Sequence, residues 1–173
     1  QMCIRDRNAP VAQFQVNSTK NAETDRFHAE NYHLALRNPA DDTGEAIGIS
    51  FGITSNIHKV GASILHERDG GGSQGSLQFY TSSDGNSISE AFRIDSGQRL
   101  LLGYNTSQTV YAAAKVQIQG TDGNNSSLSL LRHGNSPYLI LGSSGGNALQ
   151  SVTALSDNDR IGQITFAGAD GTD

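Results

Sequence analysis

An all-β fold of short antiparallel strands is expected for this chain, because three features of its sequence agree. Its 173 residues include 20 Gly but only 3 Pro and no Trp. Together with abundant Ser, Thr and Asn, this is a composition rich in turn formers. Short runs alternate between apolar and small or polar residues, which is the period of a strand with one buried face. Asp-Gly and other Gly-containing pairs, which suit tight hairpins, separate these runs.

The clearest alternating run covers residues 46–54. Its apolar members fall on one face and its small members on the other: Ile47, Ile49, Phe51 and Ile53 against Gly48, Ser50, Gly52 and Thr54. Small residues let a second backbone approach closely. The same pattern predicts further strands near residues 32–37, 60–64, 77–80, 92–94, 100–103, 116–118, 127–132, 138–141 and 161–166. Residues 19–30 are the least β-like and indicate a loop or a short helical turn.

Two parts of the chain resemble each other, which predicts a repeated β unit. Residues 14–16 resemble 116–118, residues 34–37 resemble 128–132, and residues 46–51 resemble 160–166. The order is kept while the spacing drifts, as expected when loops vary between copies. We assign residues 8–114 to a first unit and residues 115–173 to a second unit that is truncated at its C-terminus. The alternative is that two Gly- and Ser-rich segments look alike by composition alone.

The first seven residues, QMCIRDR, share no pattern with the rest of the chain. They resemble the translation of sequencing-adapter DNA at the end of an assembled fragment. We therefore expect residues 1–7 to be a non-native segment and exclude them from reasoning about the fold. On that interpretation the only Cys and the only Met of the chain are not native, and the true N-terminus is missing.

The charge of the chain argues against two classes of partner. The formal net charge is −5, the pI is about 5.4, and no cluster of Lys and Arg occurs. A nucleic-acid-binding protein needs a basic face to replace the counterions of phosphates. An anionic membrane surface is disfavoured for the same reason, and no apolar run is long enough for a membrane span. We expect neither nucleic-acid binding nor membrane insertion.

No motif predicts a catalytic, cofactor-binding or metal-binding residue. Residues 70–75, GGGSQG, fit G-x-G-x-x-G, but expected strands flank them on both sides, so we interpret them as a hairpin loop. His28 and His33 lack the further ligands of a zinc site. Residues 41–42 and 157–159 lack the twelve-residue calcium loop, and no G-x-S-x-G is present. The chain is therefore not expected to be an enzyme. Paired carboxylates for glycoside cleavage need only spatial proximity and stay open as an alternative.

Two neighbouring segments carry a resemblance to a known family. Residues 75–85, GSLQFYTSSDG, are followed by residues 90–103, EAFRIDSGQRLLLG. They resemble the "G-x-L-x-F-x-T … E-x-x-R-I-D-x-x-G-x-L-x-I-G" pattern of repetitive bacteriophage tail fibres, often found upstream of a self-cleaving chaperone domain of the endosialidase type. Residues 161–171 resemble the opening of a further copy. Tyr104-Asn105 departs from the pattern, which usually continues with Gly or Thr.

The resemblance implies a homotrimeric fibre in the virion tail, extracellular once released. The chain would then be a structural or host-recognition segment whose partners are other tail proteins and a host cell-surface glycan or protein. The catalytic residues of the chaperone lie in a domain outside this chain, so none is carried over. The expected packing is sandwich-like, in repeated units, or intertwined in a trimer. The alternatives are a bacterial surface adhesin or carbohydrate-binding β-sandwich module, and part of a depolymerase that cleaves host polysaccharide.

Overall fold

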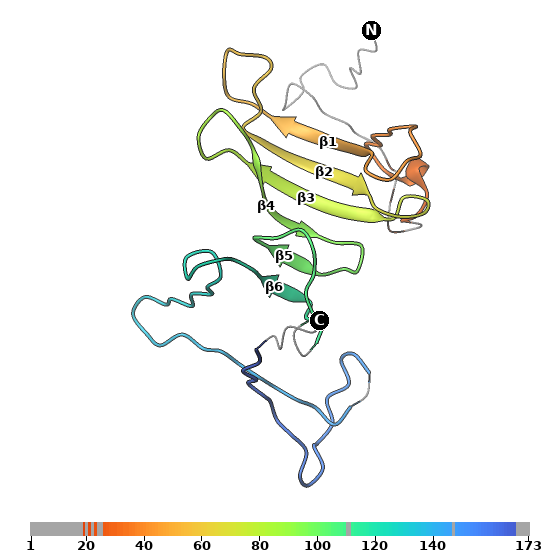
Figure 1. Cartoon of the computed structure of the whole chain (residues 1–173). Helices are drawn as coiled ribbons and strands as arrows, with labels where there is room; N and C mark the ends of the chain where they lie inside the picture. The colour runs from red at the N-terminus through yellow and green to blue at the C-terminus, as the bar shows by residue number, and fades with distance from the viewer. Residues whose placement is uncertain are drawn as a thin grey trace. The chain divides into compact units, whose positions relative to one another are not determined.

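A computed structural model describes residues 19, 21, 23, 26–109, 112–146 and 148–168 (Figure 1). The described residues contain six β-strands and one short 3-10 helix, η1 (Ala29–Asn31). The predicted all-β class is therefore confirmed. The chain divides into two compact units, Gln1–Ser89 and Glu90–Asp173. Residues 1–7, expected to be non-native, lie outside the described residues.

The first unit contains three strands in an antiparallel meander. They are β1 (Ala46–Phe51), β2 (Ala62–Arg68) and β3 (Gly75–Thr81). Ile49 pairs with Ile64, and Ile64 pairs in turn with Phe79. Figure 1 shows the three strands side by side in chain order. The strands predicted at 46–54, 60–64 and 77–80 are thus present, with bounds shifted by a few residues.

The GGGSQG segment closes the hairpin between β2 and β3. The backbone N–H of Asp69 donates to the carbonyl of Gln74 at 3.1 Å, and Gly72 adopts a φ of +62°. At Gly75 a Cβ would lie 2.0 Å from the carbonyl oxygen of Glu67, so a side chain does not fit there without a backbone shift. No helix begins after this loop, since β3 follows it directly.

The two faces of this sheet differ in chemistry. Paired residues project to the same face of a sheet, and neighbours along a strand project to opposite faces. One side, which we call the apolar face, carries apolar side chains from all three strands: Ile47, Ile49, Phe51, Ile64, Leu77 and Phe79. The opposite face carries mainly small and polar residues: Gly48, Ser50, Ser63, Leu65, Glu67, Ser76, Gln78 and Tyr80.

Burial on the two faces is the reverse of the sequence-based expectation. Phe51 is 52% exposed and Ile49 is 43% exposed, whereas Gln78 is 1% exposed and Ser76 is 2% exposed. The alternating pattern predicted that the apolar side of β1 would be buried. That expectation is wrong for the single chain, because no second layer of the described residues covers Phe51 and Ile49. Sandwich-like packing therefore stays a prediction.

The second unit contains β4 (Ser89–Ile94), apart from its first residue, together with β5 (Leu100–Leu102) and β6 (Val116–Ile118). β4 and β5 pair antiparallel, with Arg93 opposite Leu101. β5 and β6 pair parallel, with Leu101 opposite Gln117. This parallel pair departs from the expected antiparallel arrangement. Its physical basis is the connection between β5 and β6, residues 103–115, since parallel neighbours need a crossover of about a dozen residues or more.

Four predicted strands are absent from the described residues. The runs at 32–37, 127–132, 138–141 and 161–166 form no strand. Their apolar side chains lie in water, for example Leu128 at 71% and Phe166 at 96% exposed. Alternation indicates which side chains would share a face, but a strand also needs a neighbouring backbone to accept and donate its hydrogen bonds. These four segments have the alternating pattern, but they have no neighbouring strand with which to form hydrogen bonds.

Leu101 is the one large apolar side chain that is fully buried among the described residues, at 0% exposure. We expect Leu101→Ala to lower the free energy of unfolding by about 2–5 kcal/mol, because truncation removes buried methyl groups and leaves a cavity. Urea unfolding followed by circular dichroism measures this change. The matched control is Val116→Ala on the paired strand, where the side chain is 60% exposed and the expected change is within about 0.5 kcal/mol. Equal losses in the two variants would contradict the assignment of Leu101 as the core of this unit.

Candidate functional site

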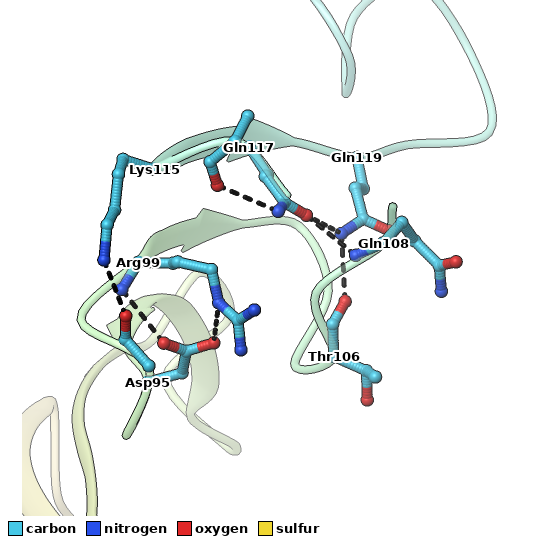
Figure 2. A network of polar contacts seen from close by, with 9 residues as sticks. Asp95, Arg99, Thr106, Gln108, Lys115, Gln117 and Gln119 are labelled. Carbon is cyan, nitrogen blue, oxygen red and sulfur yellow. Dashed lines mark hydrogen bonds and ion pairs between the residues drawn. The ribbon is translucent and has the colours of Figure 1, made fainter. Parts of the chain in front are cut away.

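The densest group of polar contacts in the second unit begins at the turn between β4 and β5. The carboxylate of Asp95 accepts the backbone N–H of Arg99 at 2.9 Å and the guanidinium Nε of Arg99 at 2.7 Å. The backbone N–H of Gln98 donates to the carbonyl of Asp95 at 2.9 Å, and Gln98 has a φ of 59°. Figure 2 shows Asp95 and Arg99 facing each other across this turn. One acidic side chain thus holds both the backbone and the side chain of the returning strand.

The pKa of Asp95 is shifted by this environment. Partial burial raises it, but the hydrogen bonds from Arg99, the positive charge of Arg99 and the backbone N–H of Gly97 together outweigh burial. The net result is a pKa below the ordinary value of 3.8. A lowered pKa means that the folded protein binds the ionised form of Asp95 better than the protonated form. Asp95 is thus a stabilising carboxylate, not a proton donor near neutral pH.

The side chain of Gln117 on β6 holds the connection between β5 and β6 in place by hydrogen bonds. Its side chain is among the few buried polar ones, at 9% residue exposure. The side-chain oxygen accepts the backbone N–H of Gln108 at 2.8 Å, and Nε2 donates to the carbonyl of Ala114 at 3.0 Å. Gln119 adds a bond from its Nε2 to the carbonyl of Thr106 at 3.0 Å. These side chains satisfy backbone groups of a segment that has no ladder of its own (Figure 2).

Two more contacts complete this network. Lys115 donates from Nζ to the carbonyl of Gly97 at 2.8 Å, which ties the start of β6 to the β4–β5 turn. Gly103, which follows β5, has a φ of +85°, and a Cβ there would lie 2.0 Å from the carbonyl oxygen of Gln119. Only glycine fits this position without a shift of the backbone. The network therefore organises turns and connections, and its donors and acceptors are used within the protein.

The residues that resemble the tail-fibre pattern have structural roles in this unit. Glu90 and Arg93 form an ion pair in which Nε lies 2.7 Å from Oε1, with both side chains mostly shielded from water. Asp95 holds the turn, and Gly103 occupies a position where a side chain does not fit. Leu101, the buried core residue, stands at a position that the pattern leaves open. The pattern thus describes the requirements of a hairpin and of the strand that follows it.

A shallow groove of about 350 Å³ lies in the first unit, between residues 36–41 and one end of the sheet. Arg68, which lines it, donates from Nε to the carbonyl of Gly70 at 2.7 Å and forms an ion pair with Asp41. His66 Nε2 lies 3.1 Å from the carbonyl oxygen of Ser73, and Asn38 donates to a carboxylate oxygen of Glu45 at 3.2 Å. The groove combines charged groups and amide donors of the kind that bind polar ligands such as sugar hydroxyls.

The acidic and histidine side chains weighed as ligands are dispersed. His28 Nδ1 lies 3.3 Å from a carboxylate oxygen of Glu30. Asp159 accepts the backbone N–H of Ser156 at 2.7 Å, as a turn carboxylate does. Asp41 pairs with Arg68 in the groove. Within the described part of the chain, no group of three or more His, Cys, Asp or Glu side chains is close enough to hold a metal ion.

Neither the groove nor the polar network was predicted from the sequence. The signal for the network was present in the DSGQR turn, where an Asp four residues before an Arg brackets a Gly. The groove left no such signal, because its lining comes from two segments that are distant in the sequence, residues 36–47 and 66–73.

Among the described residues, no helix has the length and hydrophobicity needed to span a bilayer.

Comparison with protein-family models, with curated proteins and with solved structures finds no match to this chain. Its function is therefore inferred from its own residues and geometry.

We expect Gln117→Ala to lower the free energy of unfolding by about 1–3 kcal/mol, because the backbone N–H of Gln108 and the carbonyl of Ala114 lose their partners. Urea unfolding measures the change, and hydrogen exchange at Gln108 should accelerate. The matched control is Gln108→Ala, which removes an exposed side chain of the same type while its backbone N–H stays in place. A loss in the control as large as that in Gln117→Ala would contradict the proposed role of Gln117.

We also expect the stabilising effect of Asp95 to depend on pH. Because its pKa is lowered on folding, its contribution is present above the ordinary value of 3.8 and is lost as the pH falls through the folded-state pKa. Asp95→Asn should therefore be less stable than the original chain near neutral pH. The difference in unfolding free energy should shrink well below pH 3.8. A difference that stays constant over this range would contradict the charge-based explanation.

Proposed function

We propose that this chain is a structural and host-recognition segment of a bacteriophage tail fibre and acts as a homotrimer in the virion tail, without enzymatic activity. The observation that carries this proposal is the exposure of its apolar side chains. Strand-forming residues such as Phe51 and Ile49 lie 52% and 43% exposed, while Leu101 is the one large apolar side chain fully buried among the described residues. Such a chain needs partners to cover its apolar surface.

The polar groups of the chain fit a shaft or a recognition surface. The carboxylates and amides that are buried or paired hold turns, as Asp95 does, or fasten connections, as Gln117 does. The resemblance of residues 75–103 to repetitive tail fibres supplies the biological setting. In that setting the groove lined by Asn38 and Arg68 is a candidate contact for a host-surface glycan.

A second candidate function is a bacterial surface adhesin or carbohydrate-binding module. The groove favours it, since Arg68 and Asp41 place charged groups of the kind that bind sugar hydroxyls at its lining. The two candidates differ in what they require of the chain. A binding module folds and acts as a single copy, whereas a fibre segment depends on its partner copies.

The mass of the chain in solution tests the proposal. Light scattering behind a sizing column, at several protein concentrations, should give three times the chain mass of 18.3 kDa, because the trimer buries the exposed apolar residues. A well-behaved monomer at every concentration would contradict the fibre proposal and favour the binding module. A stable dimer would also contradict it, since the copy number is wrong for the fibre.

A further inference from the structure

We propose that the apolar face of β1, β2 and β3 is the surface through which copies of this chain pack together, each against the same face of two further copies. This inference rests on the proposed function for the number of copies. The choice of surface comes from the register of the sheet and from the burial of its two faces, which are independent of that function.

The apolar face is continuous across all three strands. Ile49, Ile64 and Phe79 lie in one cross-strand row, and Phe51 and Leu77 occupy the rows on either side of it. Phe51 is 52% exposed, Ile49 is 43% exposed and Leu77 is 39% exposed. An exposed apolar patch of this kind marks an interaction surface. The opposite face is already sealed by its own hydrogen bonds, since Gln78 donates to Ser76 at 2.8 Å and accepts from Tyr80 at 2.8 Å.

The charge of the apolar face suits a second copy of itself. Identical surfaces that meet around an axis bring identical groups together, so a charged face would repel its copies. The rows that contain Ile49 and Phe51 carry no ionisable side chain. The third row of the face, Ile47, His66 and Leu77, contains one ionisable side chain, that of His66. Arg68, at the end of β2, is neutralised by its ion pair with Asp41. The opposite face includes the carboxylate of Glu67, so copies of that face would bring like charges together.

The size of the face argues against a simple pair. Three strands about 4.8 Å apart, with six residues rising about 3.3 Å each, make a patch of roughly 300 Å². A stable complex of two proteins needs about 800 Å² from each partner. One face is therefore too small to hold two copies by itself. It is sufficient as one section of a longer shared interior to which each copy also contributes other exposed apolar residues of the same unit, such as Ile53 and Ile57.

A substitution pair on neighbouring residues of β1 tests the surface. Phe51→Asp places a charge on the apolar face, and Ser50→Asp places the same charge on the opposite face at a position that is also exposed. Light scattering of the full chain should show that Phe51→Asp dissociates to monomers and that Ser50→Asp stays trimeric. Trimers in both variants would overturn the surface proposed here while the fibre proposal stands. A monomeric original chain would overturn the fibre proposal itself.

A labelling experiment decides the case in which Phe51→Asp fails to fold. Cys3 is the only cysteine, so Cys3→Ser gives a background without thiols. In that background Ile49→Cys should react with a maleimide at least tenfold more slowly than Ser50→Cys at concentrations where the chain is trimeric. The two rates should become equal in urea. Equal rates in the folded trimer would show that this face stays open to water when the copies associate, which would overturn the surface proposed here.

Discussion

Side chains project alternately to the two faces of a β-sheet, and this constraint determines most of what the molecule can do. In the first unit it places Ile49, Ile64 and Phe79 in one row, while Ser63 and Gln78 are turned to the other side. An apolar row stabilises a sheet only when something removes it from water. No layer of the described residues does so for Ile49, and the sheet is consequently incomplete in the single chain. The proposals of a trimer and of its packing surface follow from that incompleteness.

The second unit also has a small hydrophobic core, and hydrogen bonds from polar side chains hold its turns and connections. Leu101 is fully buried, but the turn, the crossover connection and the start of β6 are held by Asp95, Gln117 and Lys115. Hydrogen bonds to charged or buried groups contribute only about 1–3 kcal/mol each. Such contacts define a local shape well, but they do not replace a hydrophobic core. A fibre segment whose core is shared between copies has this balance of strong local geometry and weak independent burial.

The two candidate uses of the chain place different demands on the groove beside residues 36–41. In the proposed fibre each copy would carry one such groove, so a glycan that binds it would be held at several points. In a single-copy binding module it would be the sole site. The groove carries the same chemistry in both cases, with Arg68 held in position by Asp41 and by the carbonyl of Gly70. What separates the two functions is the number of copies, not the ligand.

Much of the β structure follows from the sequence. Period-2 alternation located β1, β4 and β6, and the Gly-rich stretch at 70–75 located the hairpin between β2 and β3. The tail-fibre pattern singled out Asp95 and Gly103, although not the contacts that explain them, and it left the position of the buried Leu101 open. The division of the chain into repeated units at residue 115 stays a prediction. The two compact units of the structure meet at Ser89, but they are defined by packing and not by repetition of the sequence.

By itself the sequence determined which residues share a strand face, because alternation is a local property of the extended backbone. Tertiary structure alone decided which strands have neighbours. It paired β5 with β6 in parallel, left residues 127–132 and 161–166 without a ladder, and left Phe51 uncovered. Pairing depends on backbone groups far apart in the chain, and covering a face depends on a surface that another segment or another copy supplies. Neither strand pairing nor the covering of a face can be predicted from the alternation of apolar and polar residues in a short segment.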